Sequence, residues 1–280
     1  MTTAVRLALA QMTSGITAAD NALWLEQAIA QAAKGGAQIL CTPEMSGLLD
    51  RDRARLFAGA QLESEDIVLA RVRAAARQHK IWVALGSLAV RAAPEADKLA
   101  NRSFLIDDQG EIQARYDKIH LFDVDVAAGH SYRESASFAP GSAAVVAHTP
   151  WATMGLSICY DLRFARLYDA LSQAGAQILL VPAAFTQPTG QAHWHVLLRA
   201  RAIEAGAFVV AAAQSGTHAD GRQTFGHSLV INPWGEILLD MGTEAAVAFC
   251  DIDLQAVADV RARIPALAHR RDIVLAEGAR

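Results

Sequence analysis

The sequence predicts an α/β protein in which two sheets pack face to face between outer layers of helices, a four-layer α-β-β-α sandwich with an internal pseudo-two-fold repeat. The first supporting observation is the pentapeptide Gly-Ala-Gln-Ile-Leu, which occurs at residues 36–40 and again, letter for letter, at 175–179. The second is that each copy follows an amphipathic helical segment and precedes a proline, Pro43 or Pro182. The third is the shared order of helix, strand and hairpin after each copy. A single doubly wound sheet fits the repeated hairpins less well.

The elements of the first half follow from local patterns. Residues 5–10 form a short apolar run that is typical of a buried strand, and apolar residues recur at helical spacing after it. The expected elements, in order, are strand 5–10, helix 22–34, strand 36–40, helix 66–79, strand 81–85 and a hairpin over 104–112. Residues 91–98 contain Pro94 and several charges, which indicates a surface loop.

The second half repeats this order with helix 164–174, strand 175–179, helix 193–205, strand 208–212 and a hairpin over 229–237. Gly110 and Gly235 occupy equivalent turn positions in the two hairpins. Residues 252–264 have a helical pattern that ends at Pro265. The segment beyond it lacks amphipathicity. It fits either a tail that leaves the domain to pack on a partner subunit or a tail that lies on its own chain.

Composition limits the classes of function. Of the 280 residues, 52% are hydrophobic and 19% charged, so we expect a single globular domain over 1–280, with a core of about 4–252 and a C-terminal tail of 253–280. The net charge of −4 argues against nucleic acid as a partner. No apolar run reaches the length of a membrane span, and the N-terminus lacks a signal-peptide layout. Three widely spaced cysteines favour a reducing compartment, and we expect a cytoplasmic protein.

Cys159 is the first candidate for chemistry. Residues 154–158 suit a buried strand, and a helical pattern begins at Asp161, so the thiol lies where a strand ends and a helix begins. The positive end of a helix favours thiolate over thiol, which suits a nucleophile. For an isolated cysteine, the alternative is a small buried hydrophobic side chain.

A nucleophilic thiol also needs a base and a group that stabilises charge. Glu44 comes just after the strand 37–40 and can take a proton, although a capping or solvated side chain is the alternative. Lys118 has apolar neighbours and can stabilise an oxyanion if a carboxylate keeps it charged. Glu134 is either a second carboxylate of the site or a loop residue paired with Arg133.

The remaining patterns indicate neither a cofactor nor a metal ion. His193 and His195 form a His-x-His pair, but no further ligand motif accompanies them. We therefore expect these histidines in the core or on the surface, no metal site, and no cofactor.

Three motifs carry a family resemblance: Pro-Glu-Met-Ser-Gly at 43–47, Tyr-Asp-Lys-Ile-His-Leu-Phe-Asp at 116–123, and Ile-Cys-Tyr-Asp-Leu-Arg-Phe at 158–164. In this order they resemble the nitrilase superfamily of carbon–nitrogen hydrolases, and the resemblance runs from about Val5 to beyond Asp272. It implies the four-layer sandwich and a catalytic triad of Glu44, Lys118 and Cys159, assisted by Glu134. It also implies a homodimer or a higher homo-oligomer, assembled through the helix after the cysteine and the C-terminal tail.

Within the superfamily, residues 188–194 and 198–204 resemble the branch that contains deaminated-glutathione amidase and ω-amidase. Residues 211–218 and the short connection to 225–228 favour the former. The resemblance implies hydrolysis of a primary carboxamide of a small α-keto acid to carboxylate and ammonia. The expected substrate contacts are Tyr160, Arg163, Phe185 and Thr189. Arg163 either pairs with the substrate carboxylate or forms a salt bridge with Asp161 or Glu44.

In the expected mechanism Glu44 takes the thiol proton, Cys159 attacks the amide carbon to form a thioester, and Lys118 with the backbone N–H after Cys159 holds the oxyanion. An ω-amidase acting on α-ketoglutaramate, a nitrilase proper and an N-carbamoyl amidohydrolase are alternatives with the same triad. A non-catalytic scaffold of the same fold is an alternative from another class, and the presence of all three triad residues argues against it.

Overall fold

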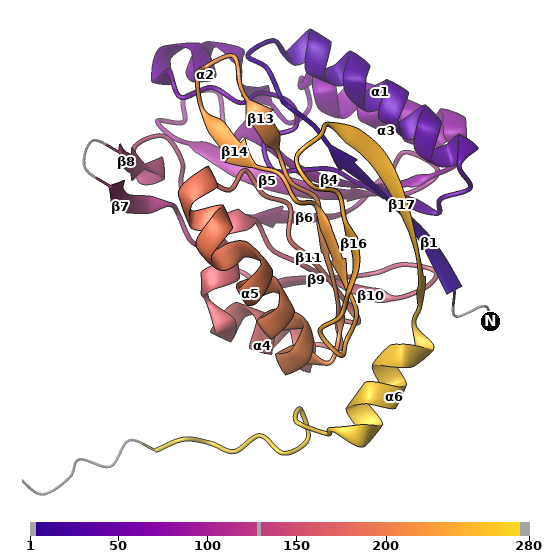
Figure 1. Ribbon diagram of the computed structural model, residues 1–280. Coiled ribbons are helices and arrows are strands. Elements are labelled where there is room, and N and C mark those ends of the chain that lie inside the picture. The colour runs from indigo at the N-terminus through magenta and orange to yellow at the C-terminus, as the bar shows by residue number, and fades with distance from the viewer. Residues whose placement is uncertain (1–3, 128–129, 275–280) are drawn as a thin grey trace, which may run out of the picture.

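The computed structural model describes residues 4–127 and 130–274. Two sheets lie face to face, with α1 and α3 on the outside of one and α4 and α5 on the outside of the other (Figure 1). The four-layer sandwich predicted from the sequence is confirmed. The helices are α1 (Ala18–Lys34), α2 (Arg53–Gly59), α3 (Ile67–His79), α4 (Ala165–Gln173), α5 (Gln187–Ala205) and α6 (Gln255–Arg263), with short 3-10 helices η1 (Glu134–Ala136) and η2 (Cys159–Arg163).

The two sheets have matching topologies. The first runs β17 (Ala246–Asp253), β1 (Ala4–Gln11), β2 (Ile39–Cys41), β4 (Trp82–Arg91), β5 (Leu99–Ile106) and β6 (Ile112–Asp117), with β3 (Gln61–Leu62) paired to β4. The second runs β9 (Val145–His148), β10 (Thr153–Leu156), β11 (Ile178–Leu180), β12 (Phe208–Ala211), β15 (Leu229–Ile231) and β16 (Ile237–Asp240). Each has three parallel strands in the middle, an antiparallel strand on one side and an antiparallel hairpin on the other.

The repeated pentapeptide has a structural reason in both halves. Gly36 and Gly175 follow α1 and α4 with φ of +76° and +89°, a conformation that glycine adopts without a Cβ penalty. The next residue, alanine in both copies, returns its N–H to the last helical turn. The Gln38 side chain then accepts from the N–H of Arg6 (2.6 Å), and that of Gln177 accepts from the N–H of Thr153 (3.3 Å). Each copy therefore ends a helix and ties the next strand to its neighbour.

Alternating side chains of β1 divide the core. Leu7 and Leu9 are buried in the cluster that also contains Met154 and Leu156 of the second sheet. Ala8 and Ala10, which point to the opposite face, are buried in the cluster that contains residues of α1 and α3. Alternate residues of a strand point to opposite faces, and both faces of β1 are covered. One face therefore contributes to the core between the sheets, and the other contacts the outer helical layer.

Several boundaries differ from the sequence expectations. β17, which follows the second half, completes the first sheet by pairing with β1, a long-range pairing that local patterns do not reveal. α5 begins at Gln187 rather than at 193, with Pro188 in its first turn, where proline costs no hydrogen bond. The helix expected from Asp161 is divided into η2 and α4, because Phe164 between them has a non-helical backbone.

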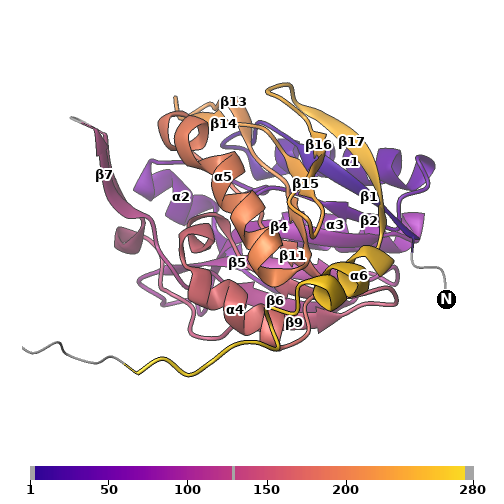
Figure 2. The same ribbon diagram turned by 60° about the horizontal axis from the view of Figure 1, so that its bottom comes forward.

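The C-terminal segment leaves the sandwich (Figures 1 and 2). The Arg261 side chain in α6 donates to the carbonyls of Ala176, Ala205 and Gly206, which holds α6 against the ends of α4 and α5. After α6 a turn covers residues 266–269, and residues 270–274 have no regular secondary structure. Ile273 is 95% exposed, and Arg270 pairs with Asp169 of α4. Of the expected tail 253–280, the last six residues lie outside the described part. Among the described residues, no helix has the length and apolarity that crossing a membrane requires.

We predict that Gly86→Ala lowers the free energy of unfolding by at least about 1–3 kcal/mol, because its Cβ would overlap fixed backbone. A Cβ built on Gly86, in β4, lies 2.1 Å from the Thr42 carbonyl oxygen and 2.4 Å from that of Pro43. Urea denaturation measures the effect. The matched control is Gly15→Ala, whose new Cβ meets no atom nearer than 3.8 Å and should change stability by less than about 0.5 kcal/mol. Equal stability of Gly86→Ala and the parent would contradict this account of the close approach.

Candidate active site

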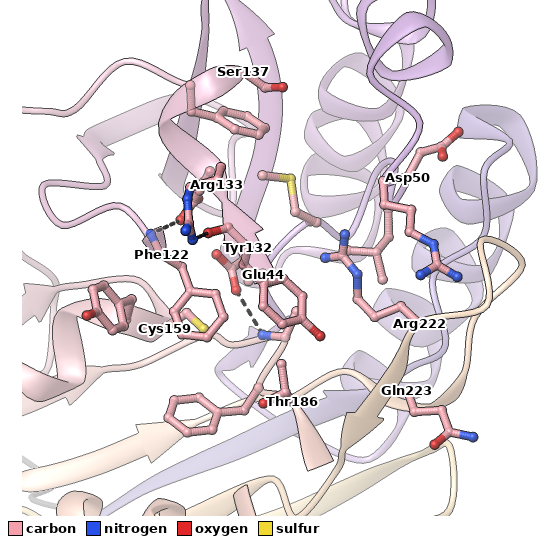
Figure 3. A pocket seen from close by; sticks show the side chains of 18 of the residues that line it. Glu44, Asp50, Phe122, Tyr132, Arg133, Ser137, Cys159, Thr186, Arg222 and Gln223 are labelled. Atoms are coloured by element: carbon pink, nitrogen blue, oxygen red, sulfur yellow. Dashed lines mark hydrogen bonds between the residues drawn. The ribbon is translucent and has the colours of Figure 1, made fainter. Parts of the chain in front are cut away.

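The sequence-predicted catalytic residues meet at one cavity. Glu44 follows β2, Lys118 follows β6, and Cys159 follows β10, so each side chain comes just after the end of a strand. The carboxyl ends of parallel strands are a common location for ligand sites in α/β sheets. Here the first sheet supplies the carboxylate and the ammonium, and the second supplies the thiol. Figure 3 shows Glu44 and Cys159 at the cavity.

Lys118 is held between two carboxylates. Its Nζ lies 2.9 Å from Glu44 Oε1 and 2.9 Å from Glu134 Oε2. The lysine side chain is 3% exposed and those of Glu44 and Glu134 are 6% and 12% exposed, so water screens these pairs weakly. Glu134 also accepts from the N–H of Phe122 at 2.6 Å. The alternative pairing of Glu134 with Arg133 is not formed, because Arg133 pairs with Asp125.

The backbone after β11 contacts the side chain of Glu44 and the main chain of Cys159. The N–H of Ala184 donates to Glu44 Oε2 at 2.9 Å, and the N–H of Cys159 donates to the Pro182 carbonyl at 2.9 Å. These residues flank Ala183, which is the repeat counterpart of Glu44. The second half of the repeat therefore supplies main-chain contacts where the first half supplies a carboxylate.

Cys159 has a φ of +50°, a left-handed conformation that is uncommon for residues other than glycine. Met45, next to Glu44, has a φ of +56°. Such conformations persist where surrounding contacts enforce them and concentrate at functional sites. At Met45 the enforcing contact is the Ser87 hydroxyl, which accepts from the Met45 N–H at 2.9 Å.

Sequence reasoning did not identify Asn101 as part of the site. Its side-chain amide donates to Glu44 Oε1 (2.9 Å) and to Glu134 Oε1 (3.2 Å). Its main-chain carbonyl accepts from the main-chain N–H of Lys118. It thus contacts all three charged residues. Asn101 lies within β5 and outside the three motifs, so no local pattern marks it.

Asp161 is a second residue whose role in positioning the site was not identified from the sequence. Its buried carboxylate accepts from the N–H of Ile158 (2.9 Å), the Tyr116 hydroxyl (2.6 Å) and the N–H of His120 (3.0 Å). The His120 ring lies 2.7 Å away through Nδ1. Asp161 thereby ties the segment that carries the thiol to the segment that carries Lys118. The available signal was that Asp161 lies in one family motif, 158–164, and that its partners Tyr116 and His120 lie in another, 116–123.

The charges at the site depend on one another. Burial acts against ionisation of Glu44, but Lys118 and the hydrogen bonds to the carboxylate outweigh it and hold the pKa of Glu44 below its ordinary value. Burial likewise acts against the charged form of Lys118, yet Glu134 and Glu44 raise the pKa of Lys118 well above its ordinary value. The site therefore contains an ionised base beside a permanent cation at neutral pH.

The thiol differs from the sequence expectation. Burial, with the nearby Glu44 charge, raises the pKa of Cys159 well above its ordinary value, so the resting group is a thiol rather than a thiolate. The expected stabilisation by a helix dipole is wrong in this environment, because η2 is only five residues long and these effects dominate. The nucleophile consequently needs Glu44 to remove its proton.

The cavity has a volume of about 670 Å³ and contains Cys159, Glu44, Lys118 and Glu134 in its lining. Tyr160, Phe185 and Thr189, three of the expected substrate contacts, also line it. An apolar wall comes from Met45, Leu48, Leu49, Leu56 and Phe138, and cationic side chains come from Arg51, Arg133 and Arg222. Volume and lining suit a small organic molecule that carries negative charge.

Arg163, the fourth expected contact, is not in the cavity lining. Its guanidinium lies over the rings of Tyr160 (5.9 Å) and Phe185 (5.5 Å) and 3.3 Å from His193 Nδ1. It thus stands behind two residues that do line the cavity. The carboxylates considered as its salt-bridge partners contact other groups, Glu44 with Lys118 and Asp161 with the Tyr116 hydroxyl.

Comparisons with known proteins agree with this geometry. The carbon–nitrogen hydrolase family model matches residues 6–262. A deaminated glutathione amidase of Yersinia enterocolitica is 40% identical over 95% of this chain and 92% of its own length. A human omega-amidase is 35% identical over 96% of each chain.

A solved amidase from Nesterenkonia sp. AN1 aligns with 95% of this chain and 94% of its own at a TM-score of 0.80 and 29% identity. In that structure the acetamide moiety of fluoroacetamide is added covalently at the active-site cysteine. Family match, relatives and fold agree with one another. The chain therefore belongs to the carbon–nitrogen hydrolase family, whose members here act as amidases on carbon–nitrogen bonds other than peptide bonds.

Proposed function

We propose that this amidase cleaves the amide of a small α-keto acid, with deaminated glutathione as the favoured substrate, through a Cys159 thioester. The observation that carries the proposal is the convergence of Glu44, Lys118, Glu134 and Cys159 at one end of an anion-compatible cavity. A scaffold protein would have no use for a buried lysine between two carboxylates beside a thiol, since such groups are costly to bury.

In the first half-reaction Glu44 removes the Cys159 proton as the sulfur bonds to the amide carbon, and the carbonyl electron pair moves to oxygen. Lys118 donates to this oxyanion together with the N–H of Tyr160, the second residue of η2, where helical N–H groups lack an acceptor within the helix. The oxyanion collapses, the carbon–nitrogen bond breaks, and the leaving nitrogen takes the proton from Glu44.

In the second half-reaction Glu44 takes a proton from water, whose oxygen bonds to the thioester carbon. The second oxyanion collapses with release of the Cys159 sulfur, which recovers its proton from Glu44. Glu134 keeps Lys118 charged and oriented throughout, because it holds the ammonium by two oxygens while Glu44 cycles between its protonated and ionised forms.

We predict that Cys159→Ala and Glu44→Gln each lower the hydrolysis rate at least about 10³-fold, because one lacks the nucleophile and the other the base. Product release measures the rate, and circular dichroism checks the fold. Cys250→Ala, which removes a thiol on β17 outside the cavity lining, is the matched control and should retain the parent rate. Hydrolysis by Cys159→Ala at the parent rate would rule out the thioester route.

The cavity lining favours the longer of the two keto-acid amides. Deaminated glutathione is α-ketoglutarate joined through its γ-carbonyl to cysteinylglycine, so it offers a carboxylate at each end. Its cleavage releases cysteinylglycine, which corrects the primary carboxamide and the ammonia expected from the sequence for this substrate. α-Ketoglutaramate is a primary amide that releases ammonia. Arg222 and Arg133 line the cavity on different elements (Figure 3). Each also pairs with an aspartate, Asp220 and Asp125, so the two substrate carboxylates would share these cations with them.

We predict a kcat/KM for deaminated glutathione at least about tenfold above that for α-ketoglutaramate, since the longer substrate engages more of the wall. Separate assays for cysteinylglycine and ammonia measure the two reactions. Arg222→Met should raise KM for deaminated glutathione and leave the hydrolysis of propionamide, an uncharged amide, unchanged. Preference for α-ketoglutaramate, for a nitrile or for a carbamoyl compound would assign the chain to another substrate class.

Assembly and compartment extend the proposal. We infer a homodimer or a higher homo-oligomer, because Ile273 and Val274 in the segment after α6 are 95% and 87% exposed. The three cysteines are free, which favours the cytoplasm as the compartment.

We predict that deletion of residues 265–280 reduces the molar mass in solution, because it removes exposed apolar side chains that a partner would cover. Light scattering after gel filtration measures the mass. A full-length chain that is monomeric at micromolar concentration would contradict the proposed assembly.

A further inference from the structure

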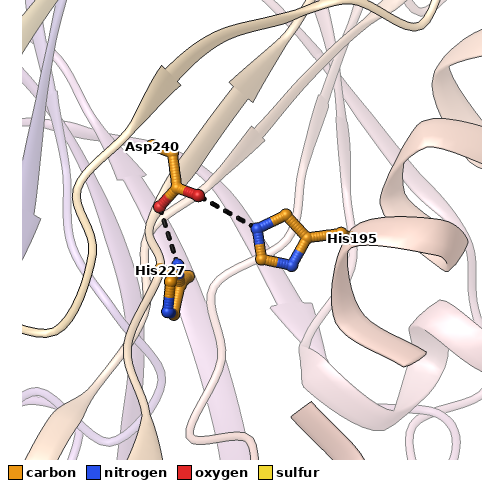
Figure 4. Close-up of side chains that lie close together, drawn as sticks. All are labelled: His195, His227 and Asp240. Carbon is orange, nitrogen blue, oxygen red and sulfur yellow. Dashed lines mark hydrogen bonds and ion pairs between the residues drawn. The ribbon is translucent and has the colours of Figure 1, made fainter. Parts of the chain in front are cut away.

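Two histidines and an aspartate meet on the second sheet away from the amidase cavity. His195 comes from α5, His227 from the turn between β14 (Gln223–Phe225) and β15, and Asp240 from the end of β16. Asp240 Oδ2 lies 3.0 Å from His195 Nε2, and Oδ1 lies 2.8 Å from His227 Nδ1 (Figure 4). One ligand atom of each residue lies within 4.8 Å of the other two. The cavity lining contains none of the three.

The backbone holds this cluster in place. His227 has a φ of +53°, and its N–H donates to the Gly242 carbonyl at 2.6 Å. The Gly242 N–H in turn donates to Asp240 Oδ1 at 2.9 Å, which fixes the carboxylate. The Phe225 ring stacks on the His227 ring with centroids 4.5 Å apart. A strained backbone enforced by such contacts is a feature of functional sites, and outer hydrogen bonds of this kind orient metal ligands.

The donor set has the chemistry of a transition-metal site. Imidazole nitrogens and a carboxylate are ligands of Zn²⁺, and ligand atoms around a tetrahedral Zn²⁺ lie about 3.3 Å apart, as follows from bond lengths near 2.0–2.1 Å. The two histidine–aspartate separations of 3.0 and 2.8 Å are close to this value, and the two histidine ligand atoms lie within 4.8 Å of each other. Side-chain exposures of 25–33% leave the cluster accessible to an ion from solvent.

The cluster also separates the two members of the His-x-His pair. Residues two apart on a helix do not share a face, and His193 accordingly lies beside Arg163 while His195 lies beside Asp240. The pair in the sequence is therefore not the ligand pair. The partner of His195 is His227, which is distant in sequence and close in the fold.

We propose that His195, His227 and Asp240 form a binding site for a divalent first-row transition metal ion, with Zn²⁺ as the favoured ion and water in the fourth position. The ion joins α5 to the β15–β16 hairpin. Gln187 in the first turn of α5 and Gln223 in β14 line the amidase cavity. The ion would therefore fix the relative position of two elements that form part of the cavity wall.

Titration of the metal-free full-length Cys159→Ala protein with Zn²⁺ alone tests the proposal, since this background removes the competing thiol of the active site. We expect one site by calorimetry and a Tm that rises by roughly 5 °C at a Zn²⁺ concentration about a hundredfold above Kd. His195→Gln and His227→Asn in the same background should each weaken binding at least about tenfold. Asparagine tolerates the left-handed backbone at position 227.

His193→Gln in the same background is the matched control, because it removes a histidine from the same helix without touching the cluster, and it should bind Zn²⁺ as the parent does. The Tm of each metal-free variant shows whether the substitution itself unfolds the protein. Absence of binding in the parent background, or equal affinity in His195→Gln and His193→Gln, would overturn the proposal. Hydrolysis by the unmodified chain is measured separately, so a failed metal site leaves the proposed amidase function intact.

Discussion

The site depends on one constraint, the burial of the Lys118 ammonium between Glu44 and Glu134. A buried cation needs compensation, and two carboxylates supply more negative charge than the ammonium neutralises. Burial and, after it, the charge of Glu44 raise the pKa of the neighbouring Cys159 thiol and keep it protonated at rest. The same arrangement leaves Glu44 ionised and able to accept that proton. The thiol of Cys159 is thus expected to lose its proton to Glu44 as the sulfur attacks the substrate, and not to be ionised beforehand.

Packing two similar halves face to face explains how the groups converge. Each half ends its buried strands at the same edge, so a carboxylate after β2 and a thiol after β10 approach across the interface between the sheets. The main chain after β11 then holds the Glu44 carboxylate through the N–H of Ala184 and the Cys159 main chain through the carbonyl of Pro182. The halves are alike in backbone and different in chemistry. Two halves with similar backbones therefore hold different side chains at equivalent positions, as Glu44 and Ala183 show.

Much of the fold could be predicted from the sequence, because its repeat contains a full set of local signals. The pentapeptide, the amphipathic helices and the hairpins each have a local cause, as Gly36 and Gln38 illustrate. The structure brings together Glu44, Lys118, Glu134 and Cys159, which stand in recognisable motifs. Asn101 could not be found, because a polar residue within β5 looks like any other until its distant partners are known. The pairing of His195 with Asp240 is likewise a long-range contact.

The pairing of β17 with β1 has a consequence for synthesis of the chain. The two strands pair from Ala4 with Asp253 to Gln11 with Ala246, so nearly the whole polypeptide separates them. During translation the outer edge of β1 stays open until residues 246–253 have left the ribosome, and an open edge can pair with another molecule. A nascent or truncated chain that ends before residue 246 therefore retains the inter-sheet core residues of β1 beside an uncovered edge. Completion of the first sheet therefore depends on β17.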